Sequence, residues 1–182
     1  MIRTARLTLR RARASDAPDL HAVFTEPAAM RYWTRPAHDS LSETEEWLAG
    51  MIAADPAEAD DFVIVHNGRI IGKAGAWRLP EIGYILHPAY WRQGLMREAL
   101  QAVIPYLFAR HPVPALTAEA DPRNAASIGL LTDLGFHETH RAERTLKWGD
   151  EWCDSVYFER PRRAGDGPAP VPVPTAPVGS GS

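Results

Sequence analysis

At the centre of this chain lies the stretch Pro88-Ala-Tyr-Trp-Arg-Gln-Gly-Leu-Met-Arg-Glu-Ala-Leu100. A strand-like run, Glu81-Ile-Gly-Tyr-Ile-Leu86, precedes it, and apolar residues at helical spacing follow it. The first N–H groups of a helix have no partner within the helix, and the helix dipole adds partial positive charge there. Gly94 lets the backbone approach an anion closely, and Arg92 and Arg97 can add charge-assisted hydrogen bonds. The stretch predicts an anion-binding loop, although such loops also precede helices that bind nothing.

Composition narrows the class of protein. The chain has 182 residues, of which 45% are hydrophobic, enough for one domain with a proper core. A formal net charge of −3 argues against a nucleic-acid-binding protein. The single cysteine, Cys153, excludes a disulfide framework and a cysteine-based metal site. No apolar run reaches about 18 residues and no signal core is present, so we expect a cytoplasmic protein that does not associate with membranes.

The end of the chain differs in composition from the rest. Residues 161–182 hold six prolines, four glycines and no aromatic residue. Such a segment cannot bury enough apolar surface to offset the entropy of ordering it. We therefore predict one domain at 1–160 and a disordered Pro/Gly-rich tail at 161–182.

The order of the expected elements is β-α-α-β-β-β-α-β-α-β-β. A capping box at Ser42-Glu-Thr-Glu45 predicts where the second helix begins, and Asn67-Gly68 predicts a tight hairpin turn. Pro105 should kink or shorten the helix that follows the central stretch. The strand at 115–120 comes after that helix, so it should be a parallel neighbour of the 81–86 strand. The fold class is therefore α/β, with a sheet of mixed direction and one parallel crossover.

Four blocks of sequence occur along the chain in this order: Glu81-Ile-Gly-Tyr84, Trp91-Arg-Gln-Gly-Leu-Met-Arg-Glu-Ala-Leu100, Asp121-Pro-Arg-Asn-Ala-Ala-Ser127 and Leu134-Gly-Phe136. With them, the chain resembles the GNAT superfamily of acyl-CoA-dependent N-acetyltransferases. The nearest branch is similar to the ribosomal-protein N-acetyltransferases, which modify protein N-termini. The resemblance implies a mixed, mostly antiparallel sheet of about seven strands, flanked by about four helices. It also implies that the parallel strands 81–86 and 115–120 splay apart to admit the cofactor.

The resemblance also implies a site for acetyl-CoA, with no metal. The family's loop pattern begins at Trp91 and should hold the CoA pyrophosphate, although Met96 replaces the small residue that usually closes it. The backbone of the 81–86 strand should pair with the pantetheine amides as an added strand would. The implied cofactor-binding residues are Tyr84, Ile85, Leu86, Arg92, Gln93, Gly94, Leu95, Met96, Arg97 and Asn124.

Acyl transfer to an amine requires a proton acceptor for the amine and a hydrogen-bond donor for the leaving thiolate. Many family members place a tyrosine for the thiolate where this chain has Leu131. Ser127 is the only hydroxyl on the same helix face, so we predict Ser127 as the thiolate partner; the alternative is a small polar residue packed into the helix. For the base we predict Glu119, with Glu81 as its rival and Glu143 third. Each of these carboxylates could equally be a structural or surface group.

The acceptor cannot be identified from the sequence. Tyr32 and Trp33 lie in the loop that lines the acceptor side in this family, and they are the predicted substrate-binding residues. From 39 to 61 the chain holds eight carboxylates and no lysine or arginine, which indicates either a solvated helix face or a field that attracts a cationic amine. The expected activity is acetyl transfer to a protein N-terminal α-amine. A small-molecule amine acetyltransferase and a non-catalytic CoA-binding module are the alternatives, and the chain could be a monomer or a homodimer.

Overall fold

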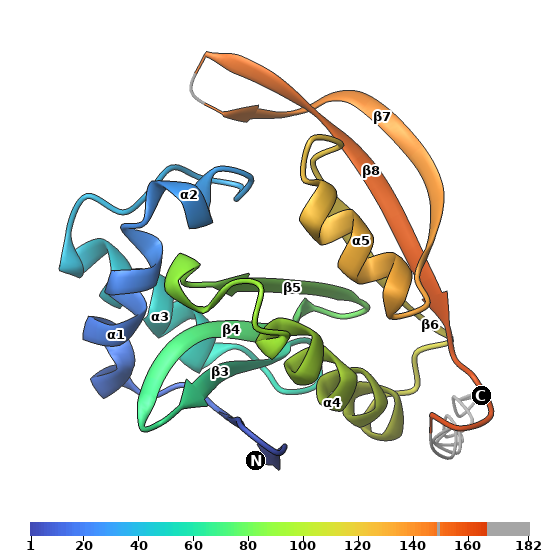
Figure 1. Ribbon diagram of the computed structural model, residues 1–182, viewed down its shortest axis with the longest axis horizontal. Helices are drawn as coiled ribbons and strands as arrows, with labels where there is room; N and C mark the ends of the chain where they lie inside the picture. The colour runs from blue at the N-terminus through green and yellow to red at the C-terminus, as the bar shows by residue number, and fades with distance from the viewer. Residues whose placement is uncertain (149, 167–182) are drawn as a thin grey trace, which may run out of the picture.

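The computed structural model describes residues 1–148 and 150–166, which form an α/β fold around one mixed sheet (Figure 1). Its eight strands lie in the order β1-β2-β3-β4-β5-β6-β8-β7. They are β1 (Ile2–Arg3), β2 (Thr8–Arg10), β3 (Asp60–His66), β4 (Arg69–Arg78), β5 (Glu81–Leu86), β6 (Ala115–Ala120), β7 (His137–Trp148) and β8 (Glu151–Pro161). The helices are α1 (Ala17–Phe24), α2 (Pro27–Met30), α3 (Leu41–Ala53), α4 (Leu95–Arg110) and α5 (Ala125–Asp133).

The first five strands pair antiparallel in sequence order, and the turn between β3 and β4 is the one that the sequence predicts. Asn67 and Gly68 have positive φ values of 48° and 81° between β3 and β4, as a tight hairpin turn requires. The chain then crosses over through α4, and β6 returns parallel to β5. β8 pairs antiparallel with β6, and β7 pairs antiparallel with β8 at the edge. The expected mixed sheet with one parallel pair is confirmed, with the two-residue β1 and the short α2 as additions.

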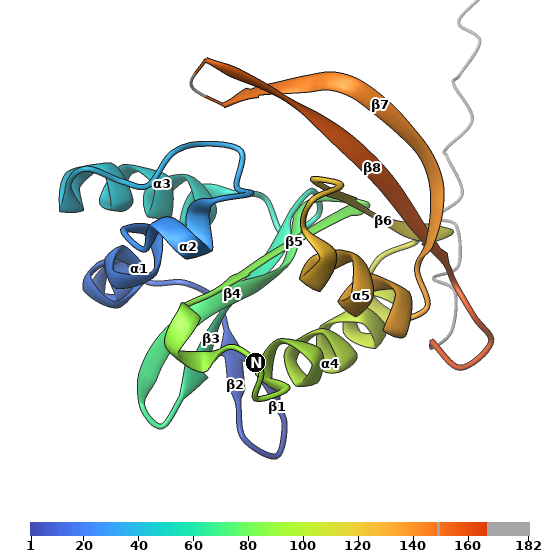
Figure 2. The same cartoon turned by 45° about the horizontal axis from the view of Figure 1, so that its top comes forward.

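Contact between the two halves of the sheet is minimal at the parallel pair. Within the described strands, the ladder between β5 and β6 consists of the single pair Glu81–Thr117. Beyond that pair β5 and β6 diverge toward their carboxyl ends, and the two halves of the molecule form an open V (Figure 2). The loop after β5 and the start of α4 lie on one side of this V.

Helices cover both faces of the sheet, and each face has its own core. α4 and α5 pack on one face around a cluster that includes Leu100, Leu107 and Leu131. α1, α2 and α3 pack on the other face of the meander with Val63 and Ile85 beneath them (Figure 2). Side chains alternate along a strand, so neighbouring residues of β5 such as Ile85 and Leu86 belong to different cores.

Two local expectations differ from the structure. α3 begins two residues early: Ser40 is its N-cap, and the serine side chain accepts a hydrogen bond from Glu43 N at 3.3 Å. Ser40…Glu43 and Ser42…Glu45 fit the capping pattern equally well, so the sequence alone does not choose between them. Pro105 does not shorten α4, which is continuous over 16 residues.

The packed part of the chain runs past the predicted boundary at residue 160. Asp166 is buried and accepts hydrogen bonds from the Arg160 guanidinium at 2.9 and 3.0 Å. Arg162 N donates to Pro114 O at 2.8 Å. These polar contacts hold a segment that has little apolar surface, and the rest of the predicted tail, 167–182, lies outside the described residues. Among the described helices, none has the length and apolar character needed to span a membrane.

Candidate active site

The central stretch forms a loop that ends at the first turn of α4. Gly94 is the N-cap of this helix, with φ +73°, and Leu95 is its first residue. Arg92 also has a positive φ, +59°, so both Arg92 and Gly94 have a left-handed backbone conformation. The Arg6 guanidinium donates to Gln93 O at 2.9 Å and thus fixes the loop from the β1–β2 turn. The first N–H groups of α4, which have no partner within a helix, therefore follow directly on this loop, as an anion site would require.

Arg97 and Arg6, two charged residues beside this loop, already have partners. Arg97 donates to Asp133 of α5, so its guanidinium bridges the two helices that flank the mouth of the V. Arg6 forms an ion pair with Glu98 at 2.6 Å, and Thr4 also donates to that carboxylate. The sequence gives no signal for Arg6, because its place beside the loop depends on long-range packing.

The free edge of β5 faces the opening. Tyr84, Ile85 and Leu86 pair with β4 on one edge, and their other edge lies beyond the single β5–β6 pair. The Leu86 carbonyl accepts the Trp91 indole N–H at 2.8 Å. This free edge leaves backbone groups of β5 open to an added strand-like ligand. Asn124 caps α5 through Oδ1, which accepts from Ser127 N at 3.1 Å.

Two hydroxyl groups meet across the V. Tyr84 Oη lies 2.6 Å from Ser127 Oγ and so joins β5 to α5. Leu131, one turn after Ser127, is completely buried in the core. The sequence analysis assigned a role only to the backbone of Tyr84. The hydrogen bond between its side chain and Ser127, the predicted catalytic serine, was missed.

The predicted bases lie on the sheet face opposite α4 and α5. Glu81 is the first residue of β5 and pairs with Thr117 of β6. Glu119 lies two residues after Thr117 on β6. Both line a hollow of about 320 Å³. Its other lining residues are Thr117, Ala118, Thr139, His140, Tyr157, Phe158 and Glu159. Three carboxylates therefore surround one cavity at the closed end of the V.

The two candidate bases differ in their surroundings. Burial raises the pKa of Glu81 above its ordinary value, and the nearby Glu119 charge raises it further, whereas Trp77 and Arg78 lower it. Glu119 Oε1 accepts a hydrogen bond from the Ser155 hydroxyl, which lies 2.5 Å from Thr145 Oγ1. These contacts orient the Glu119 carboxylate. Glu143 is exposed near a bulge of β7 and does not line the hollow.

An aromatic pair in the hollow was not predicted. The His140 ring stacks on Tyr157 with centroids 4.4 Å apart and planes 10° from parallel. A register shift between Glu138 and His140 places this histidine opposite Tyr157. Glu159 was also missed, because it shares the face of the hollow through its pairing with Thr117 of β6, a register between segments far apart in the sequence.

The predicted substrate-binding residues have different positions. Trp33 packs against Phe24 and lies over the Lys73 ammonium, 5.3 Å from its ring centroid. Tyr32 faces the other half of the molecule, where the Arg123 guanidinium lies 5.9 Å from its ring centroid. Tyr32 is therefore the member of the pair that reaches across the opening.

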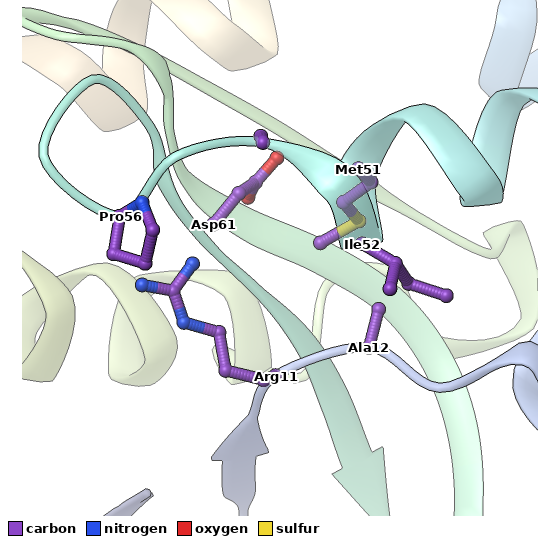
Figure 3. A pocket seen from close by; sticks show the side chains of 7 residues that line it. Arg11, Ala12, Met51, Ile52, Pro56 and Asp61 are labelled. Atoms are coloured by element: carbon purple, nitrogen blue, oxygen red, sulfur yellow. The ribbon is translucent and has the colours of Figure 1, made fainter.

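Two aspartates of the acidic region at 39–61 are buried and paired within the fold. Asp60 is buried and faces Arg11 at 2.6 Å and His111 at 2.9 Å. Asp61 is buried against Lys73 at 2.8 Å. Their charge is compensated within the fold, so neither contributes to a field for an amine. Asp61 and Arg11 also border a smaller, mainly apolar hollow of about 180 Å³ beneath the end of α3 (Figure 3).

Metal ligands are not grouped in the described part of the chain. Among residues 1–148 and 150–166, no cluster of three or more histidine, cysteine, aspartate or glutamate side chains is placed to hold a metal ion.

Replacing Gly94 by alanine should weaken acetyl-CoA binding about tenfold, measured by calorimetric titration. A Cβ at φ +73° strains the turn by about 1–2 kcal/mol and lies where the backbone should approach the phosphates. Gly68→Ala is the matched control, because that glycine has φ +81° and open space around its Cβ position, far from the loop in sequence. The control should lose similar stability and bind normally. Unchanged binding by Gly94→Ala would exclude this loop as the anion site.

Known proteins share both the sequence pattern and the fold. Residues 6–137 match the family model described as an acetyltransferase (GNAT) domain. An uncharacterized N-acetyltransferase p20 of Bacillus licheniformis is 26% identical over 74% of this chain and 81% of its own length. The [ribosomal protein uS5]-alanine N-acetyltransferase of Escherichia coli is 28% identical over 56% of this chain and 52% of its own. The solved structure of RimL, a ribosomal L7/L12 α-N-protein acetyltransferase in complex with coenzyme A, superposes with a TM-score of 0.78 at 21% identity, covering 87% of this chain and 95% of that one.

Proposed function

Because the chain belongs to the GNAT acetyltransferase family, we propose that it transfers the acetyl group of acetyl-CoA to the α-amine of a protein N-terminus. Family membership makes the chain an acetyl-CoA-dependent N-acetyltransferase. The proposal concerns the acceptor, the residues that carry the reaction, and direct attack of the amine on the thioester in a ternary complex.

One observation carries the proposal: the anion-binding loop and the carboxylate hollow lie on opposite faces of the sheet where β5 and β6 diverge. Gly94 and α4 belong to the sheet face covered by α4 and α5, whereas Glu81 and Glu119 line the hollow on the other face. A cofactor lying in the V would present its acyl group toward those carboxylates, and the amine would approach from their side. Three carboxylates around the hollow favour a cationic acceptor over a neutral or anionic one.

The α-amine is favoured over a lysine side chain by its acidity. An α-amine has an ordinary pKa near 8, about two to three units below that of lysine, so a carboxylate can deprotonate it at a smaller free-energy cost. Two of the similar proteins are described as acting on ribosomal proteins, one at an alanine and one at the α-amine. Both considerations support an N-terminal acceptor.

In the proposed reaction Glu119 accepts the proton of the attacking amine, directly or through a water molecule. The nitrogen forms a bond to the carbonyl carbon, the C–S bond breaks, and its electron pair goes to the sulfur. Ser127 donates a hydrogen bond to that sulfur as its negative charge develops. Gln93 through Arg97 would hold the pyrophosphate, and Tyr32 would contact the acceptor.

A peptide panel tests the acceptor. Release of free CoA should be measured with peptides that begin in alanine or serine, with the same peptides acetylated in advance, and with small amines. The free N-terminal peptides should react and the blocked ones should not, even where they contain lysine. Turnover on small amines alone would contradict the proposal and assign a small-molecule acceptor.

A further inference from the structure

The hydroxyl pair between β5 and α5 has a fixed geometry. Tyr84 projects from the same face of β5 as Ile82 and Leu86, which are buried against the α4–α5 core. Its Oη lies 2.6 Å from Ser127 Oγ and 3.4 Å from the Ser127 carbonyl oxygen. The phenol therefore lies within hydrogen-bond distance of both oxygen atoms of Ser127.

The direction of the hydrogen bond follows from the chemistry of the two groups. A phenol is a stronger acid than an alkyl hydroxyl, so Tyr84 is the better donor and Ser127 the better acceptor. Burial raises the pKa of Tyr84 to about 12, which keeps the phenol protonated at neutral pH. The Ser127 backbone is also fixed, because its N–H donates to Asn124 Oδ1. With its oxygen occupied by Tyr84, the serine hydroxyl has its own proton free to point into the V.

We propose that Tyr84 is a positioning residue, whose phenol orients the Ser127 hydroxyl so that its proton points toward the sulfur of the leaving CoA. This inference rests on the proposed role of Ser127. When the C–S bond breaks, the electron pair stays on the sulfur, which accepts the hydrogen bond from Ser127. Tyr84 keeps its own proton and holds the serine rotamer, and the proton of the amine goes to the carboxylate on the other face. Tyr84 touches neither the sulfur nor the acyl carbon in this arrangement.

A double-mutant cycle of Tyr84 and Ser127, with kcat as the measured quantity, tests the proposal. Ser127→Ala should lower kcat about a hundredfold, since it removes the donor itself. Tyr84→Phe should lower kcat about tenfold, with KM for acetyl-CoA unchanged within about twofold, because the serine remains but loses its orientation. The double variant should equal Ser127→Ala alone, since Tyr84 acts only through the serine. Losses that multiply in the double variant would overturn the proposal, as would a Tyr84→Phe effect confined to KM.

A second readout requires no acceptor and therefore does not depend on the proposed N-terminal substrate. The thiolate absorbance of enzyme-bound CoA, followed against pH, reports the pKa of its thiol. That pKa should lie below the free-thiol value in the wild type and return toward it in both Tyr84→Phe and Ser127→Ala. Tyr106→Phe is the matched control: this tyrosine packs against the same core, and its hydroxyl makes no hydrogen bond to the described residues. A wild-type value equal to that of free CoA would overturn the proposal.

Discussion

Replacing Glu119 by glutamine is expected to lower kcat about 10²–10³-fold, with KM for acetyl-CoA changed little. The amide keeps the size of the side chain and can still accept a hydrogen bond from Ser155, but it cannot take a proton from the attacking amine. The measurement is the steady-state rate of CoA release with saturating peptide. Glu143→Gln is the matched control and should keep wild-type activity, because Glu143 is exposed outside the hollow.

Glu81→Gln separates the two candidate bases. If Glu119 is the base, Glu81→Gln should lower kcat less than tenfold. The raised pKa of Glu81 means that the folded state binds this proton more tightly than the unfolded state does. Stability is therefore lost as pH rises from the ordinary glutamate range through the folded pKa. Glu81→Gln should remove this loss and raise the melting temperature at pH 7, with no gain below pH of about 4. A larger kcat effect at Glu81 than at Glu119 would reverse the assignment.

Lys73→Ala should cost about 3–5 kcal/mol of the free energy of unfolding. Lys73 is 2% exposed, and its ammonium lies 2.8 Å from Asp61 Oδ2. The substitution leaves a buried carboxylate without its counter-charge and also removes the contact with Trp33. A domain of this size has a total stability of about 5–15 kcal/mol, so the loss should be plain as a lower urea midpoint at constant slope.

A double substitution isolates the electrostatic part of that loss. Lys73→Met combined with Asp61→Asn removes both charges and nearly preserves volume. It should recover most of the stability, because the cost of the single change comes from the unpaired charge that remains. If the double variant were as unstable as Lys73→Ala, packing around the lysine stem would be the main contribution instead.

The loop and the parallel crossover could be predicted because their signals are local. Gly94 before a helical pattern, Asn67-Gly68 between two strands, and a helix between two short apolar runs each follow from neighbouring residues. These features position β5, β6 and α4, and with them the V. The faces of Glu81 and Glu119 follow from strand alternation once the crossover is known.

What could not be predicted depends on contacts between distant segments. Tyr84 and Ser127 are 43 residues apart, and their hydrogen bond exists only because α5 packs over the diverging strands. The start of α3 depends on a choice between two equivalent capping registers. Asp61 appeared to belong to an acidic surface, yet a lysine from the neighbouring strand neutralises it in the interior.

The single pair Glu81–Thr117 acts as a fulcrum for the two halves of the sheet. If the two halves rotated about this residue pair, each residue would move in proportion to its distance from the pair. Leu86 lies five residues away, about 17 Å along an extended strand, whereas Glu119 lies two residues away, about 7 Å. The end of β5 can therefore move about two and a half times as far as Glu119 does, and Glu81 itself lies at the pivot. Opening for a bulky ligand would thus displace the carboxylates less than the strand edge that receives the cofactor.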